Sequence, residues 1–219
     1  MPEWAPAVAR QMLGGLELTL VISLTTAIAA TAIGVVLGSL ACLRSPAITL
    51  PIGAYVELWR GLPVILTLFF VFFMLPAVGV RLDAVYAALI GLTLWASANS
   101  TEIVRGAVRS IPAGQAQAAS ALGLGWVQAM RCVILPQAQR RMLPPLVSLM
   151  SNLVQTSALA AAIGVAELTQ TAERQRERLT LLGDSHSLEI FGTVMVLYFV
   201  ICLPMTRASA RLERRLQGW

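Results

Sequence analysis

Long blocks of apolar residues, separated by shorter polar segments, run along the whole sequence. A bilayer core ~30 Å thick is crossed by ~20 helical residues, so blocks of this length predict transmembrane helices. Pro144 and Pro204 fall near predicted helix ends, where helices tolerate proline. The pattern predicts an all-α membrane protein of about five transmembrane helices, with residues 1–219 forming one transmembrane domain. The helices are placed at about Leu16–Leu43, Leu50–Leu75, Val85–Val104, Leu143–Val165 and Leu188–Met205.

The distribution of arginine predicts how these helices are oriented. With the N-terminus outside the cytoplasm, ten arginines fall in the inner segments and five in the outer ones. Basic residues are enriched in cytoplasmic loops, so this bias favours a periplasmic N-terminus and a cytoplasmic C-terminus. The inner arginines are Arg44, Arg105, Arg109, Arg131, Arg140, Arg141, Arg207, Arg211, Arg214 and Arg215, and the outer ones are Arg10, Arg81, Arg174, Arg176 and Arg178.

Composition excludes several classes of function. Charged residues make up 12% of the chain, against roughly 25% in soluble globular domains. All 16 basic side chains are arginine, so the chain lacks the lysine that a P-loop ATPase or a Schiff-base enzyme needs. The arginines follow a membrane pattern rather than a nucleic-acid-binding patch, the three cysteines lack metal-ligand spacing, and one histidine builds no catalytic triad. We expect no catalytic residues, no metal site and no nucleic-acid partner, and any ATP hydrolysis must occur on another polypeptide.

The longest inner connection, residues 105–142, has its own helical signal. Pro112 suits the first turn of a helix, the following residues are rich in alanine and glutamine, and Gly123 is a typical residue just past a helix end. We therefore expect a cytoplasmic loop over 105–142 that carries a short helix at about 112–123.

This loop resembles the EAA loop of binding-protein-dependent ABC importer permeases. The resemblance rests on Gln117–Ala119, then Gly123, then Val133–Pro136, at the spacing that the EAA loop has. The wider string Glu102–Gly106 and Ser110–Gln115 looks like the polar amino-acid branch of that family, which transports histidine, glutamate, aspartate, glutamine, arginine and opines. Gln117 stands where that family usually has glutamate, a change that removes a charge but keeps the size and hydrogen-bonding capacity.

The resemblance implies a type I ABC importer permease fold with a core of about residues 14–207. It implies an alternating-access importer of a polar amino acid in the bacterial inner membrane, with no cofactor in this chain. Implied partners are the lipid bilayer, two ATP-binding subunits that hold ATP and Mg, a second permease that is a copy or a homologue, and a periplasmic amino-acid-binding protein. The residues that it implies for ATPase coupling are Gln115, Gln117, Ala118, Ala119 and Gly123.

Polar residues inside the apolar blocks are candidates for the transport path. Polar side chains that face lipid are unfavourable, so a polar helix face is expected to meet protein or water. It either lines the path or forms hydrogen bonds between helices. Glu57 and Arg60 lie three residues apart and are expected to form a structural ion pair. The candidate path residues are Asn99, Ser148, Asn152, Gln155, Ser157 and Glu167.

Three alternatives stay open at this stage. The alternative for the 112–123 helix is an amphipathic helix resting on the lipid surface, which would need bulky apolar anchors, and Trp126 is the only aromatic residue nearby. The whole chain is alternatively a subunit of a gradient-driven secondary transporter or channel, or a membrane scaffold that carries no solute. A gradient-driven carrier usually has buried acids at mid-membrane or inverted repeats, and neither is visible in this sequence.

Overall fold

The structure, a computed structural model, describes residues 5–43, 45–183 and 186–216. Arg44, which contributes to the predicted inner charge, lies outside these residues. All regular secondary structure in these ranges is helical, without a β-strand. Its α-helices are α1 (Ala5–Leu40), α2 (Pro46–Gly61), α3 (Val64–Phe69), α4 (Ala84–Arg109), α5 (Ala113–Ala121), α6 (Trp126–Ala129), α7 (Leu135–Thr156), α8 (Leu168–Leu181) and α9 (Ser187–Leu216). Short π-helical or 3-10 segments are η1 (Phe70–Met74), η2 (Leu75–Val78), η3 (Met130–Ile134) and η4 (Ser157–Ile163).

Three helical stretches within the described residues are long and apolar enough to cross a membrane: Pro6–Leu40, Trp126–Ile163 and Ser187–Arg215. A fourth qualifies if Pro46–Gly61 and Val64–Val78, which are interrupted between Gly61 and Val64, form one span. Helix α4 covers the third predicted span but does not qualify, because the polar residues of its second half lower its mean hydropathy. The prediction of about five spans therefore depends on counting both the interrupted pair and α4.

The helix ends predicted near two prolines are wrong. Helix α7 begins well before Pro144 and continues through it, and α9 continues through Pro204. Proline is tolerated inside membrane helices where neighbouring groups compensate for the missing backbone hydrogen bond. Close to Pro144, the Ser209 hydroxyl of α9 donates to the Pro144 carbonyl at 2.7 Å, which ties α9 to α7 at this point.

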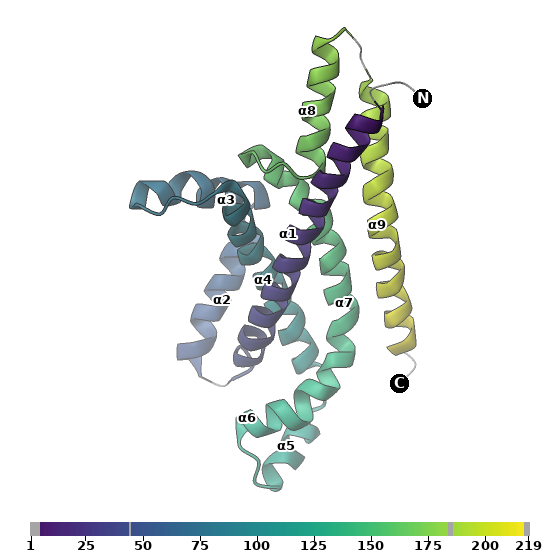
Figure 1. Ribbon diagram of the computed structural model, residues 1–219. Coiled ribbons are helices and arrows are strands. Elements are labelled where there is room, and N and C mark those ends of the chain that lie inside the picture. The colour runs from purple at the N-terminus through teal and green to yellow at the C-terminus, as the bar shows by residue number, and fades with distance from the viewer. Residues whose placement is uncertain (1–4, 44, 184–185, 217–219) are drawn as a thin grey trace. The chain divides into compact units, whose positions relative to one another are not determined.

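The chain divides into two compact units. The first comprises the described parts of Met1–Ala27, Pro63–Thr93 and Met150–Pro204. Its apolar core joins α1, α8 and the first part of α9, which lie side by side in Figure 1. A side chain at Gly15 would lie 2.7 Å from the Thr171 hydroxyl oxygen, so α1 approaches α8 at a distance that only glycine permits.

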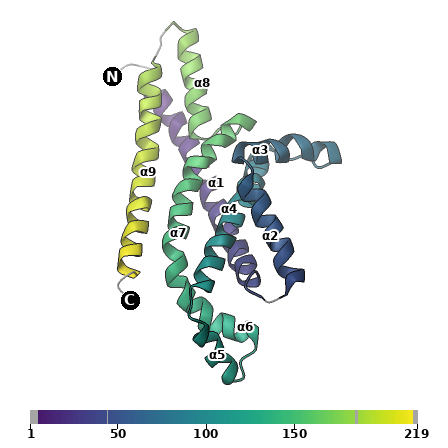
Figure 2. The ribbon, with the colours of Figure 1, turned by 180° about the vertical axis from the view of Figure 1, so that it is seen from behind.

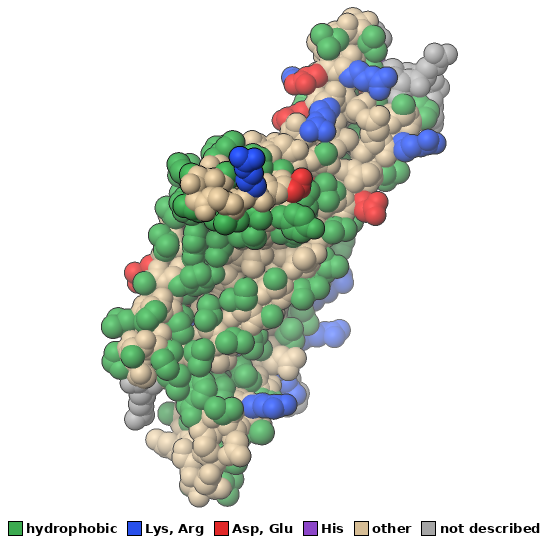
Figure 3. All heavy atoms as spheres, turned by 60° about the vertical axis from the view of Figure 1, so that its left-hand side comes forward, with side chains coloured by type: hydrophobic (Ala, Val, Ile, Leu, Met, Phe, Trp, Pro, Cys, Tyr) green, Lys and Arg blue, Asp and Glu red, His purple; other side chains and the backbone are tan. Residues whose placement is uncertain are grey.

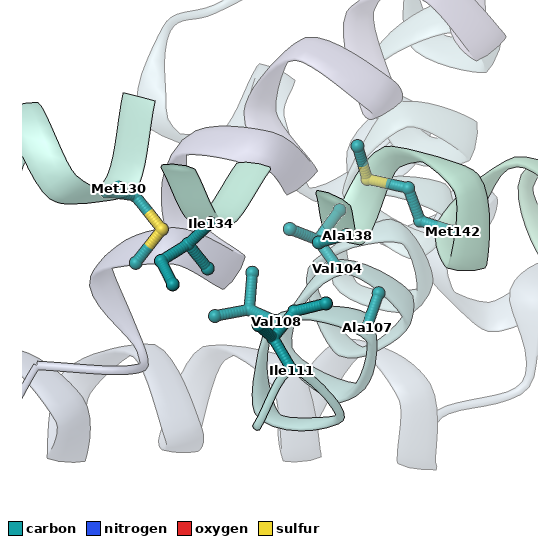
Figure 4. Close-up of a cluster of buried hydrophobic side chains, with 8 residues drawn as sticks. All are labelled: Val104, Ala107, Val108, Ile111, Met130, Ile134, Ala138 and Met142. Atoms are coloured by element: carbon teal, nitrogen blue, oxygen red, sulfur yellow. The ribbon is translucent and has the colours of Figure 1, made fainter. Parts of the chain in front are cut away.

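The second unit comprises the described parts of Ile28–Leu62, Leu94–Leu149 and Met205–Trp219. Gly34 lets α1 pack directly on α4, since any Cβ there would overlap Ser100. A second apolar cluster joins the end of α4 to η3 and the start of α7 (Figure 4). Helices α5 and α6 lie beside the lower end of α7 in both ribbon views (Figures 1 and 2). The cluster consists of Val104, Ala107, Val108, Ile111, Met130, Ile134, Ala138 and Met142.

Many large hydrophobic side chains remain exposed on the described surface. Figure 3 shows them covering much of one face, with few charged side chains among them. A soluble monomer rarely exposes apolar patches beyond a few hundred Å², so this surface is suited to contact with lipid or with another protein.

Candidate functional site

Helix α5 is short, and residues of the local sequence determine where it begins and where it ends. It begins after Pro112, which stands at the N-cap, and lies within the predicted range of 112–123. At its C-terminal end the amide of Gly123 donates to the Ser120 carbonyl at 2.9 Å, and the amide of Leu124 donates to the Ala119 carbonyl at 3.1 Å. These two bonds form a Schellman motif, which requires a left-handed residue, and Gly123 has φ of 78°.

The residues that α5 exposes are only partly the coupling residues predicted from the sequence. Gln115, Gln117 and Ala118 are exposed, but Ala119 is only 2% exposed and packs inside its own unit. A direct contact of Ala119 with a partner protein is therefore excluded in this conformation. Leu122, in contrast, is 81% exposed beside Gly123. Leu122 was not among the residues predicted from the sequence, and its only signal there is that it is an apolar residue directly before the helix-ending Gly123.

One hydrogen bond joins α5 itself to α7, and two further connections hold the segment just before α5. Gln137 Nε2 donates to Gln115 Oε1 at 3.2 Å, which joins α7 to α5. Arg141 Nη1 donates to the carbonyl of Ser110 at 2.5 Å, just before α5 begins. The apolar cluster of Figure 4 adds Ile111 to the same contact region. Helix α5 is thus packed against η3 and α6 and hydrogen-bonded to α7, and the segment just before it is held by Arg141 and the apolar cluster.

A cavity of about 490 Å³ lies between α5, the end of α4 and the segment Trp126–Ile134. Its lining is apolar apart from the side chain of Arg109. On the α5 side the lining consists of Ala113 and Ala116, so α5 presents one alanine face to this cavity and its glutamines elsewhere.

A separate groove of about 280 Å³ lies between α2 and α4 in the second unit, and it contains five charged side chains. Arg105 pairs with Glu102 through two hydrogen bonds, one of them from Nε to Oε2 at 2.9 Å. Arg60 Nε donates to Asn99 Oδ1 at 3.3 Å. The ion pair expected between Glu57 and Arg60 is not formed among the described residues, because Arg60 reaches α4 instead of its own helix. Arg109 completes the charged lining.

Glu167, a predicted path residue, is fully buried in the first unit. Its Oε1 accepts from the Gln170 amide at 2.9 Å and so caps the N-terminus of α8. Its Oε2 accepts from the Tyr198 hydroxyl at 3.0 Å and from the Thr19 hydroxyl at 3.3 Å. Burial raises the pKa of the Glu167 carboxyl, while these hydrogen bonds and one from the Thr169 backbone oppose the rise. Neither oxygen is exposed to a solute, so Glu167 joins α1, α8 and α9 instead.

The remaining path candidates are differently placed. Ser148 and Ser209 hydroxyls lie 2.8 Å apart within the second unit, which is the interhelical hydrogen bond considered as the alternative. Asn152 and Gln155 are exposed on α7, whereas Ser157 is buried and donates to the carbonyl of Val154 at 2.8 Å. In the part of the chain that the structure describes, no three His, Cys, Asp or Glu side chains come together as metal ligands.

Comparison with known proteins identifies the family. Residues 30–218 match the family described as "Binding-protein-dependent transport system inner membrane component". A probable glutamine ABC transporter permease of Bacillus subtilis (strain 168) is 34% identical over 201 residues, which are 92% of this chain and 91% of that protein. The glutamine transport system permease of Escherichia coli (strain K12) is 39% identical over 165 residues, covering 74% and 73% of the two chains.

The fold agrees with this match. A crystal structure of an amino acid ABC transporter with histidines superposes with a TM-score of 0.82 and 26% identity, over 98% of this chain and 99% of that one. The predicted all-α, type I ABC importer permease fold is therefore confirmed. On this sequence match and this fold, the chain belongs to the family of inner membrane components of binding-protein-dependent transport systems.

Proposed function

We propose that this chain is the membrane-spanning subunit of an ATP-driven importer that moves a polar amino acid across the bacterial inner membrane by alternating access. The observation that carries the proposal is the construction of α5. It is an exposed, glutamine-bearing helix with a fixed end at Gly123, it packs against η3 and α6, and it is hydrogen-bonded to α7. Such an element suits docking to a moving partner.

The partner in this proposal is a separate ATPase that holds ATP and Mg. Closure of the ATPase displaces α5 through contacts with Gln115, Gln117 and Ala118, and with Leu122 beside them. The Gln115–Gln137 bond, the Arg141–Ser110 bond and the apolar cluster of Figure 4 pass that displacement to α4 and α7. The chain itself does no covalent chemistry in this scheme, since it has no lysine for a phosphate-binding loop.

Two further partners complete the proposed assembly. A second permease subunit, a copy or a homologue, pairs with this one, and two ATPase subunits bind the pair. A periplasmic binding protein delivers the substrate on the other side. The exposed polar side chains of Asn152 and Gln155 fit a surface that meets water or the second permease, because lipid gives them no hydrogen-bond partner. Glutamine is the first candidate substrate, since two relatives carry glutamine in their descriptions.

Reconstitution tests the proposal. The chain is co-expressed with its ATPase and binding protein, placed in liposomes, and assayed for uptake of labelled glutamine and other polar amino acids. We expect uptake that requires internal ATP and the binding protein, and ATP hydrolysis that substrate stimulates. Uptake driven by an ion gradient without ATP supports the secondary-transporter alternative, and assembly without any solute uptake supports the scaffold alternative.

A further inference from the structure

The groove between α2 and α4 contains two charged side chains, Glu57 and Arg60, that form no ion pair within the described residues. Glu102 is paired with Arg105. Among the described residues, Glu57 has no ion-pair or hydrogen-bond partner, and Arg60 uses only Nε, which leaves its two terminal nitrogens open. A guanidinium and a carboxylate three residues apart on one helix therefore face the same groove without binding each other.

Their position makes this arrangement costly unless something polar occupies the groove. Helix α2 has no other charged side chain, and charged side chains on membrane helices normally face a water-filled cavity or a functional partner. The Arg60 side chain is also held in place. Asn99 Nδ2 donates to the Trp95 carbonyl at 2.9 Å, so its Oδ1 points to Arg60 Nε. Asn99 thus acts as a positioning residue for the guanidinium.

Taking the importer function above as given, we propose that this groove binds the α-amino-acid group of the transported solute. The solute's α-carboxylate binds the terminal nitrogens of Arg60, and its α-ammonium binds the carboxylate of Glu57. A guanidinium suits this role because its planar array of donors matches a carboxylate in a two-bond geometry. Both charges of the zwitterion are then neutralised without a change in the charge of the protein.

The same lining sets a preference among side chains. The lining has the three guanidinium groups of Arg60, Arg105 and Arg109 against the two carboxylates of Glu57 and Glu102. The groove therefore has more positive than negative charge. A solute with a neutral or acidic side chain is accepted, and a solute with a cationic side chain is repelled by Arg109.

The test measures binding to the permease–ATPase complex without the binding protein, so that selection by the binding protein does not enter. Labelled glutamine is the probe, and the unlabelled competitors are glutamine, glutamate, arginine, 4-aminobutanamide, which lacks the carboxylate, and glutaramic acid, which lacks the amine. A hydrogen-bonded charge contact contributes ~1.5–3 kcal/mol. Each truncated analogue should therefore compete about tenfold to a hundredfold less well than glutamine. Arginine should compete less well than glutamate.

Two variants test the assignment of each charge. Arg60→Gln should weaken glutamine binding by about tenfold or more while leaving the affinity for 4-aminobutanamide unchanged, so that the preference between them collapses. Glu57→Gln should do the same for glutaramic acid. The matched controls are Arg81→Gln and Glu17→Gln, which change exposed charges outside the groove and should leave the competitor order intact.

Several results overturn the proposal. The first is equal competition by glutamine and 4-aminobutanamide in the unmodified complex, and the second is unchanged selectivity in both variants. The third is arginine competing as well as glutamate. The fourth is the absence of saturable glutamine binding while ATP-driven uptake persists. The first, third and fourth need no variant, so misfolding of a variant does not protect the proposal. The fourth result contradicts the proposed groove site but not the importer function. Loss of ATP-driven uptake while selective binding stays intact contradicts the importer function but not the groove site.

Discussion

The side chains of Gln115 and Gln137 meet at 3.2 Å, where Nε2 of Gln137 donates to Oε1 of Gln115. The same Nε2 also donates to the carbonyl of Val133 at 2.8 Å, so both of its hydrogens are used. One amide group thus links the first turn of α5 to the π-helical turn that leads into α7. This side-chain contact connects the proposed docking helix directly to a long membrane helix.

Replacing Gln137 with alanine should loosen this link without unfolding the chain. A neutral hydrogen bond contributes ~1 kcal/mol, so we expect the ATP-coupled uptake rate to fall about fivefold. The amount of protein in the membrane should stay unchanged. The measurement is uptake per ATP hydrolysed in liposomes. Gln139→Ala is the matched control, because Gln139 is exposed two residues away and should leave this ratio unaltered. Equal effects of the two variants would contradict a coupling role for Gln137.

Gly123 closes α5 in a conformation that other residues adopt only with strain. A left-handed backbone conformation costs valine at least ~1–2 kcal/mol of conformational free energy, so the Schellman motif should open in the variant. We expect Gly123→Val to reduce uptake about tenfold or more while membrane insertion stays normal. Gly125→Ala provides the control, since Gly125 has φ of −67° and an added Cβ there meets only the end of a flexible side chain at 3.9 Å. Full uptake by Gly123→Val would count against the coupling role of this helix.

The sequence predicted that α5 exists, but it did not predict which face of α5 is buried. Pro112 and Gly123 act through local backbone chemistry, so they mark the ends of α5 without reference to the rest of the fold. Ala118 and Ala119 are chemically identical, and only packing makes one exposed and the other buried. The direction in which a helix faces depends on its neighbours, and an alanine-rich helix has too weak a pattern to reveal that direction.

Interactions between distant segments were the least predictable. The spacing of Glu57 and Arg60 on one helix predicted a local ion pair, but Arg60 binds Asn99 on another helix. Glu167 likewise receives its hydrogen bonds from Thr19 and Tyr198, which are far away in the sequence. Helical periodicity identifies residues that share a face of one helix but contains no information about which second helix packs there.

Labelling of Cys132 tests the predicted orientation of the 105–142 loop. Cys132 is exposed on η3. If the loop is cytoplasmic, a membrane-impermeant maleimide should label it in inside-out vesicles but not in intact spheroplasts. Cys132→Ser should remove most of the signal, because Cys42 is half-buried and Cys202 is buried. Labelling in intact spheroplasts would place the loop on the periplasmic side and would contradict docking to a cytoplasmic ATPase.

Glu167 should make the stability of the protein depend on pH. It follows the candidate span Trp126–Ile163, and its burial raises the carboxyl pKa in the folded state above the ordinary value. The folded protein then binds a proton more tightly than the unfolded chain. The stabilisation from this group is fully present below the ordinary pKa, and it decreases as the pH rises through the raised one.

Glu167→Gln removes this dependence, since the amide cannot ionise but still accepts hydrogen bonds from Tyr198 and Thr19. The melting temperature of the purified protein in detergent, measured from acidic to neutral pH, should fall with rising pH in the unmodified chain and stay flatter in the variant. Glu173→Gln serves as the control, because Glu173 lies on α8 and is only partly buried. The opposite result, in which Glu167→Gln is most destabilising at neutral pH and neutral in acid, would mean that the four hydrogen bonds outweigh burial and hold the carboxylate ionised.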